Sequence, residues 1–555
     1  MLPPELLVTI LSLLDFRELL KCQTVSRGFY ETIRRTASLQ YIVELGAANY
    51  GDGSLTHPST TRQRLKYLKE QQAAWKDPVI ETLETIDLVR GYDSSSFGAR
   101  KGFSFRGGVF VGAYLRGPLV QEAFNCLDVV NIRSITPEVP SWSLHLHDLM
   151  GGFDFDPAQD LLIGIERLPD SPPPTHITFH ILSLLHGTPH PRAAGIQPIR
   201  QPLDSSLQEL GTSICHLTIF GELVACSVTR STATLRGVTL MLFHWPSGHA
   251  HTELLRGYAT SVIGGLAFLS DRYLLISKCI CPHDPCGYLD IYVLDSDACG
   301  KVIPTLLTTF TLPESLNRFT FAIPNLYPGL PCNRSTVYPS ESRPLPFDIA
   351  PSPTLICCEM SLLTSNDLGD PDHLTTGYVF IISVPKLLQQ VPSTFKNELE
   401  DPQTILWDVW GPPCTRAFKM PRAFVRLSDS IFGHRLVLPN RIMDFNQLDI
   451  ARDLLRHQVR SPSPTLLREP PHSPPQEPSS DDSQNMSFDP TTNIVIEPAV
   501  IPAGDIYVND VTTALPYREV VFDIPLPFPQ ILASSDLVGL EVVDGKCRGL
   551  HILAL

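Results

Sequence analysis

Four side chains that could bind a soft metal lie within eight residues: Cys279, Cys281, His283 and Cys286. Thiolate sulfur and imidazole nitrogen are the ligands that zinc takes in structural sites. The C-x-C-x-H-x-x-C spacing is tighter than in common zinc sites, and two prolines stand among the ligands. The stretch joins two expected strands, so a zinc site and a hairpin loop that carries three thiols both stay open. We assign no metal on this pattern.

The common catalytic motifs are absent from the sequence. It lacks a phosphate-binding G-x-x-x-x-G-K-[ST] loop, a G-x-S-x-G elbow and an H-E-x-x-H helix. His145 and His147 alternate on an expected strand, so we interpret them as one surface face. Asp154 and Asp156 lie in the turn-rich FDFDP, where Asx-turn hydrogen bonds account for them. We therefore expect no enzyme and no cofactor.

The segment 461–490 could carry regulatory modifications. Ser461, Ser463 and Ser473 each precede a proline, and the segment holds eight prolines with few apolar residues. Such a composition cannot bury enough apolar surface to order itself, so we expect a disordered insertion. Phosphorylation would add a charge of about −1.5 to −2 at each serine. An unmodified spacer is the alternative.

The length and composition of the whole chain indicate what kind of fold positions these residues. Its 555 residues, 43% of them hydrophobic, predict a folded protein of two to four domains, and 51 prolines favour short strands and turns. Thirteen scattered cysteines and no secretory start predict free thiols in the cytoplasm, the nucleus or both. No apolar run reaches 18 residues, so we expect no membrane association.

Charge is unevenly distributed. Residues 1–76 carry ten Lys or Arg and seven Asp or Glu, a net +3, and the remainder carries −18. Nucleic acids and anionic membranes are bound through basic patches. An acidic body therefore predicts neither partner. The basic residues of 60–76 are interpreted as a solvated helix face and not as a nucleic-acid arm.

The first 36 residues predict three short helices. Pro3 and Pro4 suit a first helical turn, and Asp15 with Glu18 forms a capping box before the second helix. Apolar residues follow at helical spacing. So small a unit cannot bury that many leucines by itself, which leaves part of the apolar face for a partner.

The order L-P-x-E-L-L-x-x-I-L-x-x-L, an acidic turn, L-L-x-C and V-S-R-x-F resembles the F-box over residues 2–33. The resemblance implies docking onto the Skp adaptor of a Skp–cullin–F-box ubiquitin ligase. Phe29 stands where the family usually has Trp. A generic amphipathic cap packed on its own chain is the alternative. The implied adaptor contacts are Leu2, Pro3, Leu6, Ile10, Leu11, Leu14, Leu19, Leu20, Val25 and Phe29.

Residues 37–80 predict linker helices. Thr60 and Gln63 make a second capping box before TTRQRLKYLKEQQAAWK. A helix–loop–helix of this kind after the box is similar to fungal F-box proteins of unassigned substrate. We expect a stalk that sets the distance between the F-box (1–36) and the body, with few contacts crossing the break at 46–60.

Residues 81–555 read as short strands separated by Gly, Pro and Asp, and strands resume after 461–490. The runs 179–187, 240–248 and 289–297 end alike, and the middle one resembles the third strand of a WD-type blade. The predicted class is α+β multidomain, with helices followed by a degenerate WD-like β-propeller. A series of β-sandwiches is the alternative.

These elements together predict a receptor subunit of the ligase, with the F-box on the adaptor and, through it, a cullin. The propeller would hold an unknown protein substrate. A scaffold that uses its F-box for assembly is the second reading, and an enzyme with a site at the propeller mouth is the third.

Overall fold

The computed structural model describes residues 3–554 apart from 53–58, 94–101, 117–122, 133–140, 169–174, 197, 204–210, 232–235, 256–262, 279–286, 297–301, 317–318, 329–346, 350–353, 365–377, 393–401, 420–426, 461–490, 505, 534–536 and 544–545. The candidate zinc motif, the Ser-Pro sites of 461–490 and Leu2 lie outside the described residues. Among the described helices, none has the length and apolar character needed to span a membrane.

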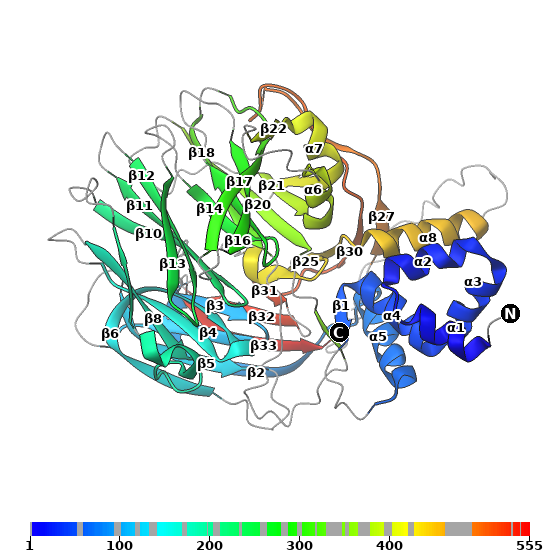
Figure 1. Cartoon of the computed structure of the whole chain (residues 1–555), viewed down its shortest axis with the longest axis horizontal. Coiled ribbons are helices and arrows are strands. Elements are labelled where there is room, and N and C mark those ends of the chain that lie inside the picture. Colours follow the sequence, from blue (N-terminus) through cyan, green and yellow to red (C-terminus); the bar gives the residue numbers. More distant parts are fainter. Residues whose placement is uncertain are drawn as a thin grey trace, which may run out of the picture.

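Five helices open the chain and lie to one side of a mainly-β body (Figure 1). They are α1 (Pro4–Leu11), α2 (Phe16–Val25), α3 (Arg27–Arg35), α4 (Ala37–Ala48) and α5 (Thr61–Lys76). Both predicted capping boxes are confirmed. The backbone N–H of Glu18 donates to Asp15 at 2.8 Å, and that of Gln63 donates to Thr60 at 3.3 Å. These caps define where α2 and α5 begin.

The body is a β-propeller whose antiparallel sheets stand around a ring (Figure 1). One continuous run contains β3 (Phe103–Arg106), β4 (Val109–Tyr114), β5 (Phe124–Asn131), β6 (Ser141–Asp156), β7 (Leu161–Glu166), β8 (His176–Ser183) and β9 (Ile199–Pro202). The long β6 connects the two halves of this run, because its first part pairs mainly with β5 and its second part with β7.

Further sheets follow in chain order. The first contains β10 (Gly211–Phe220), β11 (Leu223–Ser231), β12 (Arg236–His244) and β13 (His249–Leu255). The second contains β14 (Ile263–Phe268), β15 (Tyr273–Lys278), β16 (Tyr288–Ser296), β17 (Val302–Thr311) and β22 (Gln403–Ile405), which pairs parallel with β17. The third contains β18 (Phe319–Pro328), β20 (Leu355–Thr364), β21 (Tyr378–Ser383) and β23 (Thr415–Lys419). The runs expected to end alike correspond to β8, β12 and β16. Each is the third strand in the order β6-β7-β8, β10-β11-β12 or β14-β15-β16.

Two of the next three sheets join distant parts of the chain, and the third is a local hairpin. One contains β24 (Ile431–Phe432), β25 (Arg435–Leu438), β26 (Arg441–Asp444), β30 (Tyr517–Val521) and β27 (Thr491–Val495), so strands on both sides of 461–490 share it. Two pairs are β1 (Tyr50–Asp52) with β19 (Phe347–Ile349), and β28 (Ala499–Ile501) with β29 (Val511–Thr513). In the described part of the body there are three α-helices: α6 (Val384–Gln390), α7 (Trp407–Cys414) and α8 (Gln447–Arg460).

The ring is closed by the two ends of the body. The early strand β2 (Glu81–Asp93) pairs antiparallel with β33 (Lys546–Ala554), and β32 (Leu537–Val543) and β31 (Gln530–Ala533) complete that sheet. The closing sheet thus contains strands from both ends of the body. The run GDIYVND (504–510) also predicts a strand, and that expectation was wrong. The described residues of 504–510 form a turn between β28 and β29, in which Gly504 has a φ of 88° and donates to Tyr507 O at 2.9 Å.

Candidate protein-binding site on the N-terminal helices

Helix α1 and the turn after it present two parallel apolar stripes. The outer stripe, Leu6, Ile10 and Leu13, is 53%, 48% and 82% exposed. The inner stripe is displaced by one residue and contains Leu11, which is 2% exposed. Large apolar side chains rarely gather on a free surface without a partner. The outer stripe is therefore a candidate docking surface.

The buried part of the inner stripe lies in a small core that is shared with α2, α3 and α4. Leu39 and Val43 of α4 form a small core with Leu11, Leu19 and Ile33. Residues 39 and 43 are one helical turn apart, so their side chains lie on one face of α4. This shared core decides which stripe of α1 is buried.

The predicted adaptor contacts fall into three groups. Pro3, Leu6, Ile10 and Val25 are exposed, Leu14, Leu20 and Phe29 are partly buried, and Leu11 and Leu19 are buried. Contact with the adaptor stays a prediction, and Leu11 and Leu19 lie in a small core that they share with α3 and α4. They support the surface from beneath. Leu13 was missed, although it continues the spacing of Leu6 and Ile10 by one further turn.

The 37–80 helices are not a free stalk, and the expectation of few contacts with the body was wrong. The second face of α4, with Tyr41 and Leu45, shares a core with Leu65, Leu68 and Trp75 of α5 and with residues of the propeller. The propeller side of this core includes Phe432, Val437, Ile442, Val520, Phe522, Phe528, Ile531 and Leu537. Burial of this apolar surface stabilises the packed arrangement relative to one in which the helices stand apart from the propeller.

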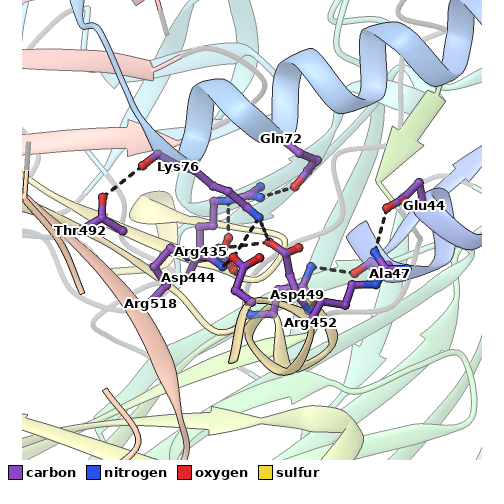
Figure 2. A network of polar contacts seen from close by, with 12 residues as sticks. Glu44, Ala47, Gln72, Lys76, Arg435, Asp444, Asp449, Arg452, Thr492 and Arg518 are labelled. Carbon is purple, nitrogen blue, oxygen red and sulfur yellow. Dashed lines mark hydrogen bonds and ion pairs between the residues drawn. The ribbon is translucent and has the colours of Figure 1, made fainter. Parts of the chain in front are cut away.

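A buried charge pair of the body meets α5. Arg435 Nε donates to Asp444 Oδ2 at 3.1 Å, and both side chains are almost fully buried. Arg435 Nη2 also donates to Gln72 Oε1 at 2.6 Å, and the guanidinium lies 4.8 Å from the ring centre of Trp75. Figure 2 shows Arg435 between Gln72 and Asp444. A buried ion pair needs such additional partners to offset its desolvation.

Helix α8 joins the same junction from another side (Figure 2). Lys76 Nζ, at the end of α5, lies 2.7 Å from Asp449 Oδ2 and 3.3 Å from Asp453 Oδ2. Arg518 of β30 donates to the same two carboxylates, at 3.1 Å to Asp449. Burial raises the pKa of Asp449, but Lys76 and Arg518 outweigh it and leave the pKa below its usual value.

Helix α8 also contacts α4. Arg452 Nη1 donates to Glu44 Oε2 at 2.9 Å, and Asn446 Nδ2 donates to the carbonyl of Ala47 at 2.7 Å. Asn446 also caps α8 by accepting from the N–H of Asp449 at 3.2 Å. In the sequence, an N-x-x-D pattern before apolar residues at helical spacing indicates the start of this helix.

The remaining candidate residues lie elsewhere in the ring. His145 and His147 are exposed on β6, as expected. Asp156 accepts from Ala158 N at 3.0 Å in a turn, also as expected. Asp154 is a correction, because it accepts from Ile219 N of β10 at 3.1 Å and lies 4.0 Å from Arg106 of β3. It joins neighbouring sheets.

Metal ligands do not gather among the described residues, where no three of His, Cys, Asp and Glu are placed to hold an ion. Seven cysteines of the described part of the chain are free thiols: Cys22, Cys126, Cys226, Cys357, Cys358, Cys414 and Cys547.

Comparison with known proteins identifies the N-terminal unit. The F-box-like family model matches residues 1–40. These residues form the helical unit that carries the outer stripe, so an F-box-like N-terminal unit precedes the propeller body. A search of the curated proteins gave no match.

Solved structures add little. A Bacteroides ovatus protein described as a dipeptidyl aminopeptidase IV is 8% identical with a TM-score of 0.24, covering 50% of this chain and 34% of its own. Cobalt-substituted ACO of Synechocystis is 9% identical with a TM-score of 0.23, covering 56% and 61%. The match thus spans less than two thirds of either protein. At these scores neither likeness supports a function.

Proposed function

We propose that this chain is the substrate-recognition subunit of a Skp–cullin–F-box ubiquitin ligase, acting in the cytoplasm or nucleus. The F-box-like match to residues 1–40 carries the proposal. The outer stripe of Leu6, Ile10 and Leu13, with Val25, supports it, because these side chains are exposed with no covering element of the described chain.

The helices would bind the adaptor through apolar burial. Fully burying one such side chain is worth roughly 1.5–3 kcal/mol, and each 1.4 kcal/mol changes affinity about tenfold. Leu11 and Leu19 would act indirectly, by holding α1 and α2 in place. The cullin would be reached through the adaptor.

The propeller would bind a protein substrate. Its role would be positional, since it would raise the concentration of the substrate near the ubiquitin-charged enzyme while other subunits supply the chemistry. An acidic body favours a partner with basic or neutral surface over nucleic acid.

The proposal is tested by reconstitution. The purified full chain is mixed with a Skp adaptor and a cullin, and complexes are separated by size. We expect a ternary complex, with Leu6→Ala and Ile10→Ala together weakening adaptor binding by about two decades. Binding of adaptor without cullin would indicate an assembly scaffold, and unchanged affinity in the double variant would refute the docking surface.

A matched control comes from the body. Leu406 and Val409 are also exposed, at 61% and 60%, and lie at the start of α7. Leu406→Ala with Val409→Ala removes a similar exposed apolar area away from the F-box. It should leave adaptor affinity unchanged.

A further inference from the structure

Helix α8 belongs to the body but contacts both helices that connect the F-box to it. We propose that α8 is a clamp that fixes the direction of the F-box relative to the propeller, with Asp449 and Asp453 as its positioning residues. This inference rests on the proposed function, in which that direction decides where a bound substrate stands relative to the rest of the ligase.

The first observation is that α8 engages two separate helices of the connection. Its Asp449 and Asp453 contact Lys76 at the end of α5, and its Arg452 contacts Glu44 of α4. Thr492 of β27 adds a hydrogen bond to the carbonyl of Lys76 at 3.3 Å. The connection is therefore held at two points that lie far apart in the sequence.

The second observation is that the same carboxylates also bind the propeller. Arg518 of β30 donates to both Asp449 and Asp453, and its side chain is 3% exposed. Asp449 thus contacts both a cation of the helical connection and a cation of the ring (Figure 2). Asp453 contacts the same two cations. Removing their charge would leave Lys76 and Arg518 close together without a counter-charge.

The third observation is the division between apolar and polar contacts. The core of α4, α5 and the propeller holds the parts together, but apolar burial has no directional preference. Hydrogen bonds and ion pairs depend on both distance and angle. The polar contacts of α8 therefore set the angle at which the apolar surfaces meet.

The test measures that angle in the full chain. Spin labels are attached through unnatural amino acids at exposed Lys21 of α2 and Asp271 of the turn before β15, and their distance distribution is recorded by pulsed electron resonance. For Asp449→Asn with Asp453→Asn, we expect the distribution to shift and broaden relative to the parent chain. A distribution that matches the parent would overturn the clamp.

A control pair carries the same change of charge. Asp408→Asn with Asp523→Asn alters two exposed acids of the body and should leave the distances as in the parent. If the control shifts them equally, the effect is general charge and the proposal fails. Circular dichroism confirms that each variant is folded before its distances are compared.

A charge exchange gives a second, milder test. Glu44 and Arg452 are each about one-third exposed or less, so the fold tolerates their replacement better than that of a buried pair. Glu44→Arg should broaden the distances by repelling Arg452, and adding Arg452→Glu should restore them. Failure of this restoration, with both variants folded, would contradict a role for the α4–α8 contact.

Adaptor affinity separates this inference from the proposed function. The clamp variants leave the outer stripe of α1 untouched, so they should bind the Skp adaptor as the parent chain does. Shifted distances with normal adaptor binding support both proposals. Shifted distances in a chain that never binds the adaptor would support the clamp and refute the ligase assignment.

Discussion

The guanidinium carbon of Arg435 lies 4.8 Å from the centre of the Trp75 ring, so a cation of the propeller stacks on an aromatic side chain of α5. Trp75 is 2% exposed and Arg435 4%. Because Arg435 is also paired with Asp444, α5 covers a charge pair that would otherwise face solvent. Helix α5, which connects the F-box to the body, thus contributes to the stability of the propeller.

Replacing Trp75 with Ala should therefore destabilise the body. Truncation of a buried aromatic side chain costs about 3–5 kcal/mol, and the loss of the cation–π contact adds to it. Urea unfolding of the full chain measures the change. Tyr67→Ala, at a half-exposed position of the same helix, is the control and should change the unfolding free energy little.

Removing residues 1–76 should lower the thermal midpoint of the remaining chain. The deletion uncovers Phe432, Val437 and Phe528 and leaves Arg435 without Gln72. Calorimetry of 77–555 against the full chain checks this. Equal midpoints would mean that the shared core contributes nothing to the ring.

Leu13 and Leu11 should behave oppositely. Leu13→Asp places a charge on an 82% exposed side chain, so it should abolish adaptor binding and leave folding unchanged. Leu11→Ala empties a buried site and should destabilise the N-terminal helices by about 2–5 kcal/mol. Titration with adaptor and amide exchange of residues 3–48 distinguish the two. Normal adaptor binding by Leu13→Asp would remove Leu13 from the proposed surface.

Acid should loosen the junction through Asp449. The pKa of this carboxyl lies below its ordinary value of 3.8 in the folded chain. A lowered pKa contributes stability that is present above 3.8 and is lost as the pH falls through the folded value. The difference in thermal midpoint between the parent and Asp449→Asn should therefore shrink below about pH 4. A difference that persists at lower pH would contradict the ion-pair account.

Cleavage within 461–490 should not separate the two parts of the ring. A protease site placed in this segment yields fragments joined by the pairing of β26 with β30 and of β2 with β33. Size-exclusion chromatography after cleavage should show one species. Two species under native conditions would mean that 491–555 folds as its own unit.

Local features were predictable from the sequence because few neighbouring residues determine them. The capping boxes at Asp15 and Thr60 depend on residues three positions apart, and the third strands β8, β12 and β16 follow from short apolar runs between turns. The F-box resemblance likewise depends on one ordered stretch. These local signals do not depend on residues elsewhere in the chain.

The free face of α1 could not be predicted in this way. Residues 6, 7, 10 and 11 are all apolar, so periodicity gave one broad face. Only packing in the small core shared with α2, α3 and α4 divided it into a buried and an exposed stripe. The junction was hidden for the same reason. Lys76 and Asp453 are 377 residues apart, and no local pattern pairs charges at that separation. Ring closure brings the strands around α8 back to the N-terminal helices, so the tertiary structure decided how the F-box is held.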